Sequence, residues 1–424
     1  MPRLMIDDPS GADPRALITV ARIAAVSDIV APENQYLSVI LGTGDAVISV
    51  TPGVVITVGG AVFQTPAITL SAANLDSGVF QTGSDYYIYI CDDGSDTERY
   101  IISLNTTFPS GFTMNNSRKI GGFHFGQCRR VDNMLRPTNS AGLAYGAGWE
   151  SNVYLGIVPR SVWTLKHRPA CSPEGMVYAG SKTWFDIYLS SDAGNGSVQS
   201  VMNGIPLTGT EGYNWPAWCD RALRTGKRMP TLEESFRAGH GAPQGNNGDN
   251  VNAWTMTTNA GRNPAGQIPN AVSSIGTRDD VGNVWKWTSD VTTNADGGRV
   301  FRGSTDPNPV PFIYASWDGS RGGLEAPATG SGHGQTTRAL NTIDPPVQGW
   351  YAWDPVSPLG DTTGDGNPDN GNVWQCYDLQ HTAYLYGGDW NSGVHAGSRA
   401  LHASPNGLWR LYTSLGVRLA CDSL

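Results

Sequence analysis

Residues 387–422 read GGDWNSGVHAGSRALHASPNGLWRLYTSLGVRLACD, and two kinds of residue are interleaved in this stretch. Gly-Gly-x-Trp opens it, Gly-Ser-Arg lies at its centre and Gly-x-Arg lies near its exit. Glycine permits turns that a Cβ atom blocks, a buried aromatic ring stabilises a core, and a guanidinium offers five hydrogen-bond donors. We therefore predict a fixed frame that holds the main chain. Its members are Gly387, Gly388, Trp390, Gly397, Arg399, Gly416 and Arg418.

Each part of the frame has an expected role. Trp390 is predicted to bury its ring, and Arg399 and Arg418 to donate to main-chain carbonyls. Val417, Leu419 and Cys421 alternate with other residues, which predicts a closing strand with one apolar face.

The remaining positions of the stretch follow no periodicity and mix charge, polarity and bulk. Exposed Tyr, Trp and Arg dominate the energetics of protein interfaces, so this mixture favours a binding face for a protein target. The alternative is an ordinary polar loop over a Trp-rich core. The candidate ligand-binding residues are Asp389, Ser392, Val394, His395, His402, Ser404, Asn406, Leu408, Trp409, Arg410 and Tyr412.

Composition narrows the class of protein. Only 15% of the 424 residues are charged and the net charge is −9, which argues against nucleic acid as a partner. No apolar run approaches the roughly 20 residues of a membrane span, so no membrane insertion is expected. The 53 glycines, 27 prolines and 14 tryptophans indicate a loop-rich, mostly β protein with minor α content.

The chain is long enough for two or three domains, and its texture changes along its length. A Val/Ile/Thr-rich run at 46–65, an alternation of Tyr and Ile at 84–91 and the segment KIGGFHF at 119–125 predict short strands of a small β-sandwich or barrel. The boundaries that we predict are an attachment segment at 1–44, a β-sandwich at 45–135, a linker at 136–151 and a second, larger domain at 152–424 with an insertion at about 291–370.

Two short helices are expected in the second half. Asn214 can cap one that begins near Pro216 and runs to about Leu223. Thr231 and Glu234 have the spacing of a capping box, which predicts the start of the other.

The six cysteines are widely spaced and form no CxxC pair, so a zinc site is not expected. Buried thiols in a reducing compartment are one interpretation. The other is a late disulfide, for which Cys376 and Cys421 are the candidate pair.

Several segments occur in an order that resembles a known family. They are GKRMPTLEESFRAG (226–239), GNVWKWTSD (282–290), GGDW (387–390), GSRA (397–400) and LGVRLACD (415–422). This set resembles the C-type lectin fold shared by formylglycine-generating enzymes and the variable proteins of diversity-generating retroelements. YYIYICDDG (86–94), RKIGGFHF (118–125), HRPACSPEGM (167–176) and TWFDIYL (183–189) extend the likeness, and resemble the phage tail receptor-binding members that determine tropism.

The resemblance implies a β-sandwich followed by a C-type lectin domain in a homotrimer, with 387–422 as the variable region. It implies a host cell-surface receptor, a protein by preference, and other phage tail proteins as partners. It also implies a place in the virion, at a tail tip or fibre made without a signal peptide. In the family, variable positions derive from asparagine codons with randomised adenines. Such codons reach most of the candidate binding residues, but they do not reach tryptophan at Trp409. The alternative functions are a bacterial retroelement-diversified binding protein and, less favoured, a formylglycine-generating-like enzyme.

Catalysis is not expected. Formylglycine-generating enzymes need a cysteine pair in the region that corresponds to 389–402, which holds no cysteine here. His395 and His402 have no nearby Glu and are read as contact residues rather than metal ligands. No cofactor is required, although one acidic loop has oxygen ligands at calcium-like spacing, with a polar turn as the alternative. The candidate calcium ligands are Asp361, Asp365, Asn367 and Asp369.

Overall fold

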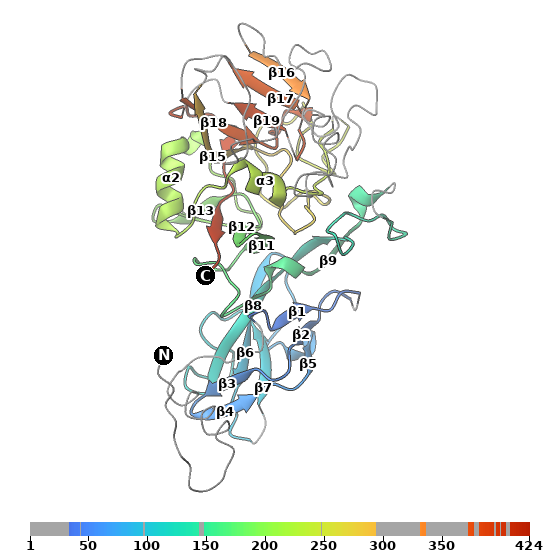
Figure 1. The fold of residues 1–424 in the computed structure, drawn as a ribbon, viewed down its shortest axis with the longest axis vertical. Helices are drawn as coiled ribbons and strands as arrows, with labels where there is room; N and C mark the ends of the chain where they lie inside the picture. The colour runs from blue at the N-terminus through green and yellow to red at the C-terminus, as the bar shows by residue number, and fades with distance from the viewer. Residues whose placement is uncertain are drawn as a thin grey trace, which may run out of the picture. The chain divides into compact units, whose positions relative to one another are not determined.

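The computed structural model describes residues 34–42, 44–95, 98–143, 148–246, 248–293, 331–335, 372–376, 381–393, 396–398, 400–403 and 408–424. Within these ranges the chain is mostly β, with two α-helices (Figure 1). This is the fold class that the sequence predicts. None of the helices in the described ranges is long and apolar enough to span a membrane.

The chain divides into two compact units. The first comprises the chain up to Phe80, Asp85–Phe123 and Val162–His167, and the second comprises Gln81–Ser84, His124–Ser161 and Arg168–Leu424. These limits differ from the predicted domain boundaries at 45, 136 and 152. A strand begins at Leu37, inside the expected attachment segment. Val162–His167 also return to the first unit, because Trp163 pairs with Gly122.

The first unit contains short antiparallel strands. One sheet has the order β1-β2-β5, β3 and β4 form a hairpin, and the other sheet has the order β10-β8-β6-β7. The bounds are β1 Leu37–Val39, β2 Ile48–Val50, β3 Val55–Val58, β4 Ala61–Gln64, β5 Ile68–Leu70, β6 Ser84–Cys91, β7 Arg99–Ser103, β8 Ser117–Arg129 and β10 Trp163–Thr164.

The two sheets of this unit pack against each other through aromatic and aliphatic side chains. The buried Tyr36 hydroxyl donates to the carbonyl of Ile120 on β8 at 2.7 Å. A Cβ atom at Gly121 would lie 2.5 Å from Leu37 Cδ1, so a glycine at this position of β8 lets β1 approach closely. Tyr86 stacks on Phe123 at 5.6 Å between ring centroids and adds to the same core.

The second unit holds most of the chain. Its largest sheet has the order β16-β17-β19-β18-β15-β20, a smaller one has the order β11-β12-β21, β13 pairs with β14, and β9 pairs with residues 125–129 of β8. The bounds are β9 Val153–Ile157, β11 Met176–Gly180, β12 Thr183–Asp186, β13 Ser191–Gly194, β14 Ser197–Gln199, β15 Trp285–Thr293, β16 Ser331–Gln335, β17 Asn372–Cys376, β18 His381–Tyr386, β19 Leu401–Ala403, β20 Leu415–Gly416 and β21 Ala420–Asp422.

Both predicted helices are present, and their caps are the predicted ones. Helix α2 spans Trp215–Arg224, and the Asn214 side chain accepts from the Ala217 N–H at 3.0 Å. Helix α3 spans Leu232–Ala238. The Thr231 and Glu234 side chains each accept from the other's main-chain N–H, which completes the capping box.

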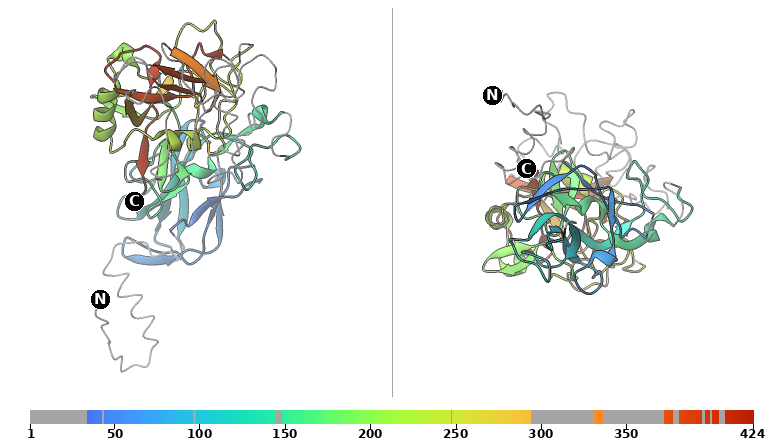
Figure 2. Two further views of the ribbon diagram at one scale, coloured as in Figure 1. Left: turned by 45° about the horizontal axis from the view of Figure 1, so that its top comes forward. Right: turned by 90° about the horizontal axis from the view of Figure 1, so that it is seen from below.

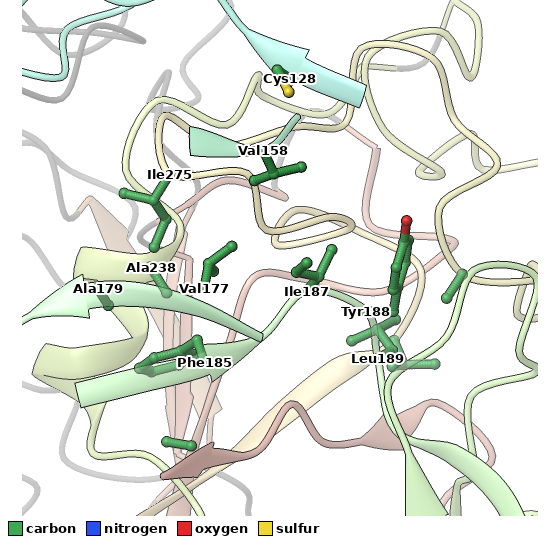
Figure 3. Close-up of a cluster of buried hydrophobic side chains, with 13 residues drawn as sticks. Cys128, Val158, Val177, Ala179, Phe185, Ile187, Tyr188, Leu189, Ala238 and Ile275 are labelled. Carbon is green, nitrogen blue, oxygen red and sulfur yellow. The ribbon is translucent and has the colours of Figure 1, made fainter. Parts of the chain in front are cut away.

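Two hydrophobic clusters make up the core of this unit. Figure 3 shows the first, in which Val177 and Phe185 of the β11–β12 hairpin pack with Ala238 of α3. In the second, Trp218 of α2 packs with Trp287 of β15 and Leu385 of β18. Helix α2 lies beside the large sheet in two views (Figures 1 and 2). These clusters support the C-terminal stretch, because residues of that stretch belong to both.

Candidate functional site

The structure describes part of the predicted binding stretch. Residues 387–393, 396–398, 400–403 and 408–422 are described, with only the main chain given at 401–403. His402 therefore has a place, on β19 opposite Leu385 of β18, but no described side chain. Outside the described residues lie Val394, His395, Arg399, Ser404 and Asn406 and the candidate calcium ligands Asp361, Asp365, Asn367 and Asp369.

The entry to the stretch requires glycine. Gly387 and Gly388 have φ of 90° and 81°, in the region that side chains disfavour. A Cβ atom at Gly387 would overlap the carbonyl oxygen of Asp280, and one at Gly388 would lie 2.6 Å from Ala396 Cβ. The Gly387 N–H donates to the Ala400 carbonyl at 2.9 Å and its carbonyl accepts from Gly282 at 2.9 Å. The entry is thus fixed from two sides.

Asp389 and Ser392 hold each other in a tight turn. The Asp389 N–H donates to Ser392 Oγ at 3.0 Å, and the Ser392 hydroxyl donates to Asp389 Oδ1 at 2.7 Å. The Asn391 N–H also donates to Asp389 Oδ1, at 3.2 Å. Both residues are part-buried. Two of the residues predicted as a freely varying face therefore also shape the loop that carries them.

Trp390 anchors the stretch to the core with only part of its side chain. Its side chain is half-buried and packs against the cluster that contains Val177 and Phe185. Its carbonyl accepts from the Asn259 amide at 3.2 Å. The sequence prediction of a ring buried in the core is correct in direction, but part of the ring remains accessible.

Arg418 is completely buried, and its side chain donates to main-chain carbonyls, as the sequence predicts. Its guanidinium donates to the carbonyl of Asp186 at 2.8 Å and also to the carbonyls of Ile187 and Arg278. Its Nε lies 3.4 Å from Oδ1 of the equally buried Asp280. One side chain therefore joins three segments that are far apart in the sequence.

Charges around Arg418 are balanced within the core. Burial lowers the pKa of the Arg418 guanidinium, but Asp280 and the other acidic groups nearby together outweigh this effect and raise it, so the group stays charged. Lys286 lies nearby, and its ammonium donates to the carbonyls of Asp280 at 3.0 Å and Gly282 at 2.7 Å. Burial lowers the pKa of Lys286 to about 7, despite the opposing charge of Asp280. This network fixes the frame and faces no solvent, so it is structural.

The end of the stretch is buried throughout. Every residue from Leu415 to Cys421 is buried, including Gly416, Arg418 and Ala420 between the apolar positions. Leu415, Val417 and Leu419 belong to the cluster that contains Trp218, whereas Ala420 belongs to the cluster that contains Phe185. A Cβ atom at Gly416 would lie 2.9 Å from Val284 Cγ2, which explains the glycine there.

Residues 409–411 form a run of three consecutive exposed residues in the described stretch, and we call them the exposed segment. Of the tryptophans whose side chains the structure describes, Trp409 alone is exposed, at 74% of its surface. Leu411 is 53% exposed. The Arg410 guanidinium carbon lies 5.0 Å from the Tyr412 ring centroid, and Arg410 donates to the Tyr412 hydroxyl. The guanidinium and the phenol thus lie together, and Trp409 precedes them in the sequence.

Residues on each side anchor the exposed segment. Leu408 and Tyr412 are part-buried and pack against the cluster that contains Trp218 and Leu385. Their carbonyls accept main-chain hydrogen bonds from Trp215 at 3.1 Å and from Gly209 at 2.9 Å, respectively. Two residues predicted as free to differ therefore contribute to the core.

The turn at 208–212 supports this segment, and sequence reasoning missed it. A Cβ atom at Gly209 would overlap the main-chain nitrogen of Tyr412, so the two backbones touch. Glu211 caps the turn by accepting from the Thr208 N–H at 2.9 Å, and Arg262 pairs with Glu211. The Arg262 hydrogen bond lowers the pKa of Glu211. The Thr208-x-x-Glu211 spacing is a capping-box signature and was the available signal.

The described residues are suited to binding a partner through side-chain contacts. They contain no group of three or more His, Cys, Asp or Glu side chains that could hold a metal ion. The exposed segment presents an indole, a guanidinium and a leucine side chain, which contribute binding energy by burial, hydrogen bonding and cation–π contact.

Residues 38–150 match the sequence family described as the Mtd second domain. The tail fiber receptor-binding protein of Bordetella phage BPP-1 is 27% identical over 307 residues, which cover 66% of this chain and 73% of that protein. The chain resembles the phage tropism determinants. This is the resemblance that the ordered motifs indicate.

Solved structures of tropism determinants share the fold. The Major Tropism Determinant M1 variant matches with a TM-score of 0.59 at 20% identity and covers 95% of this chain and 87% of its own. The U1 variant matches with the same score at 21% identity, over 95% and 88% of the two chains. The match runs through both compact units, so the predicted mostly β architecture with a C-type lectin fold is confirmed.

Proposed function

We propose that this chain is the receptor-binding protein of a phage tail and that it contacts its receptor through the stretch Gly387–Asp422. The relative with 27% identity carries that function in its name. The chain is thus a binding protein of the virion, and no catalytic role is proposed for it.

The observation that supports this proposal is that one stretch combines buried residues with a highly exposed tryptophan. Arg418 and Gly387 are buried and closely packed, whereas Trp409, between them in the same stretch, leaves 74% of its surface accessible. An apolar ring of this size gains free energy when a partner covers it, at about 25 cal/mol per Å² of apolar surface. A single exposed Trp beside an Arg is the composition of an interface hot spot, which favours a protein receptor.

Assembly would add affinity. We propose a homotrimer, attached to other tail proteins, in which several copies of the stretch engage one cell. Linked sites of modest affinity gain by avidity, often by about 10²–10⁴-fold. No cofactor is required in this proposal, and calcium at Asp361, Asp365, Asn367 and Asp369 remains a separate hypothesis. Light scattering that gives a monomer at micromolar concentration would contradict the trimer.

Binding to cells tests the function. The labelled full chain should bind saturably to bacteria that support growth of the encoding phage and compete with that phage for adsorption. Binding only to unrelated cells, or no competition, would overturn the proposal. Protease treatment of the cells should abolish binding if the receptor is a protein, and glycan removal should leave it unchanged.

A further inference from the structure

The last strand has a second neighbour besides β12. The Ala170 N–H donates to the Asp422 carbonyl at 2.8 Å, and the Leu424 N–H donates to the Arg168 carbonyl at 3.1 Å. Pro169 and Ser423 thereby face each other in an antiparallel bridge. Continuing this register by two residues places Cys171 opposite Cys421.

A direct contact shows that the two cysteines lie close together. The Cys171 N–H donates to Cys421 Sγ at 3.2 Å. Both are free thiols; Cys171 is partly accessible, and Cys421 is 2% exposed. Pro169 and Ser423 are a non-hydrogen-bonded pair by this pattern. Cα atoms of directly opposed residues in antiparallel strands are about 4.5–5.5 Å apart, within the range of roughly 4.4–6.8 Å that a disulfide requires.

We propose that Cys171 and Cys421 are an oxidative modification site, at which a peroxide converts the opposed thiols into an intramolecular disulfide. The oxidant class is hydrogen peroxide or an organic hydroperoxide. The site lies at the closing strand and uses no residue of the exposed segment.

The local charges favour this reaction at Cys421. The Cys171 thiol donates to the Cys421 sulfur and lowers the pKa of Cys421 to about 6, against the effect of burial. The ammonium of Lys227 acts in the same direction, and its own partner is the buried Asp186. The thiolate is the reactive form of cysteine, so the pair holds a reactive sulfur near neutral pH.

Peroxide would oxidise the pair in two steps. The Cys421 thiolate attacks one peroxide oxygen, the O–O bond breaks, and hydroxide leaves, so that Cys421 becomes a sulfenic acid. The Cys171 sulfur then attacks Cys421 Sγ, the S–S bond forms, and the S–O bond breaks with loss of water. Two thiols lose two electrons and two protons, and hydrogen peroxide becomes two waters.

A bond at this position would tie the end of the chain to residues before β11. The two cysteines are 250 positions apart, so the bond closes a long loop and restricts the unfolded chain. We expect a rise in melting temperature of roughly 5–10 °C, reversed by dithiothreitol.

The test uses the full chain treated with hydrogen peroxide, quenched and digested without reduction. Mass spectrometry should find the peptide of Cys171 joined to the C-terminal peptide of Cys421, with the loss of two hydrogens. The number of titratable thiols should fall from six to four. Cys219→Ser is the matched control, because Cys219 is also a partly accessible free thiol, on α2, and its loss should leave the joined peptide unchanged.

Cys171→Ser gives an independent measurement that does not depend on stability. It should prevent the joined peptide and leave a sulfenic acid at Cys421, which dimedone labels. A joined peptide of Cys376 and Cys421, unchanged thiols after peroxide treatment, or no dimedone label in the variant would each overturn the proposal.

Discussion

The guanidinium of Arg418 donates to the main-chain carbonyl of Asp186, a residue 232 positions earlier in the chain. The Asp186 N–H in turn donates to the Leu419 carbonyl at 2.9 Å. The chain segment that ends the candidate binding stretch is therefore bonded to the end of β12 by a side chain and by the main chain. This arrangement lets neighbouring residues differ, because the anchor does not depend on them.

Arg418→Lys should destabilise the protein by about 2–4 kcal/mol, because a single ammonium cannot replace a planar group that reaches three carbonyls and leaves buried acceptors unpaired. Denaturant unfolding measures the change. Arg410→Lys is the control on the exposed segment and should stay within about 0.5 kcal/mol of the parent. Equal stabilities of the two variants would show that Arg418 is not the anchor.

Gly387→Ala should lower the free energy of unfolding clearly more than Gly212→Ala does. The two glycines have nearly the same φ, 90° and 87°, so both substitutions carry left-handed strain of about 1–2 kcal/mol. A Cβ atom at Gly212 meets nothing within 4 Å, whereas one at Gly387 overlaps the Asp280 carbonyl. We expect an additional loss of about 1–3 kcal/mol at Gly387, where the backbone must move. Similar melting temperatures for the two variants would contradict the close approach.

Local signals in the sequence predicted local structure well. The caps of α2 and α3 depend on side chains within three residues of the helix start, and both form as predicted. The role of Arg418 was also predictable, because a guanidinium in an otherwise apolar run must find acceptors when it is buried.

Contacts between distant segments were not predictable. Tyr412 has the sequence context of a variable surface residue, but its ring packs against a core that includes Trp218 and Leu385. The alternation at Val417, Leu419 and Cys421 predicted a closing strand, but it could not show that β20 pairs with β15 and β21 pairs with β12, both far upstream. No local pattern contains such pairings.

Acid should weaken the turn that supports the exposed segment. The Arg262 hydrogen bond holds the pKa of Glu211 below its ordinary value near 4.5. A carboxyl group with a depressed pKa in the folded state contributes stability above its unfolded pKa, and this contribution is lost as the pH falls through the folded pKa. Glu211→Gln should therefore be less stable than the parent at pH 7 and should lose less stability between about pH 5 and 3. Parallel stability curves for the two proteins over this range would exclude the linkage.

Trp409→Ala should reduce cell binding without unfolding the protein. The side chain is 74% exposed, so its loss should change the free energy of unfolding by no more than about 0.5 kcal/mol. As a hot-spot residue it should contribute at least about 2 kcal/mol to binding, which is roughly a 30-fold loss of affinity. Leu223→Ala is the matched control, because Leu223 on α2 is 73% exposed and lies outside the stretch.

Leu408→Ala should instead lower the stability of the protein before it affects binding, since Leu408 packs against the core. Saturation binding on cells, with melting curves for each variant, separates these effects. Wild-type affinity of Trp409→Ala, with a loss in Leu223→Ala, would move the contact surface away from the exposed segment.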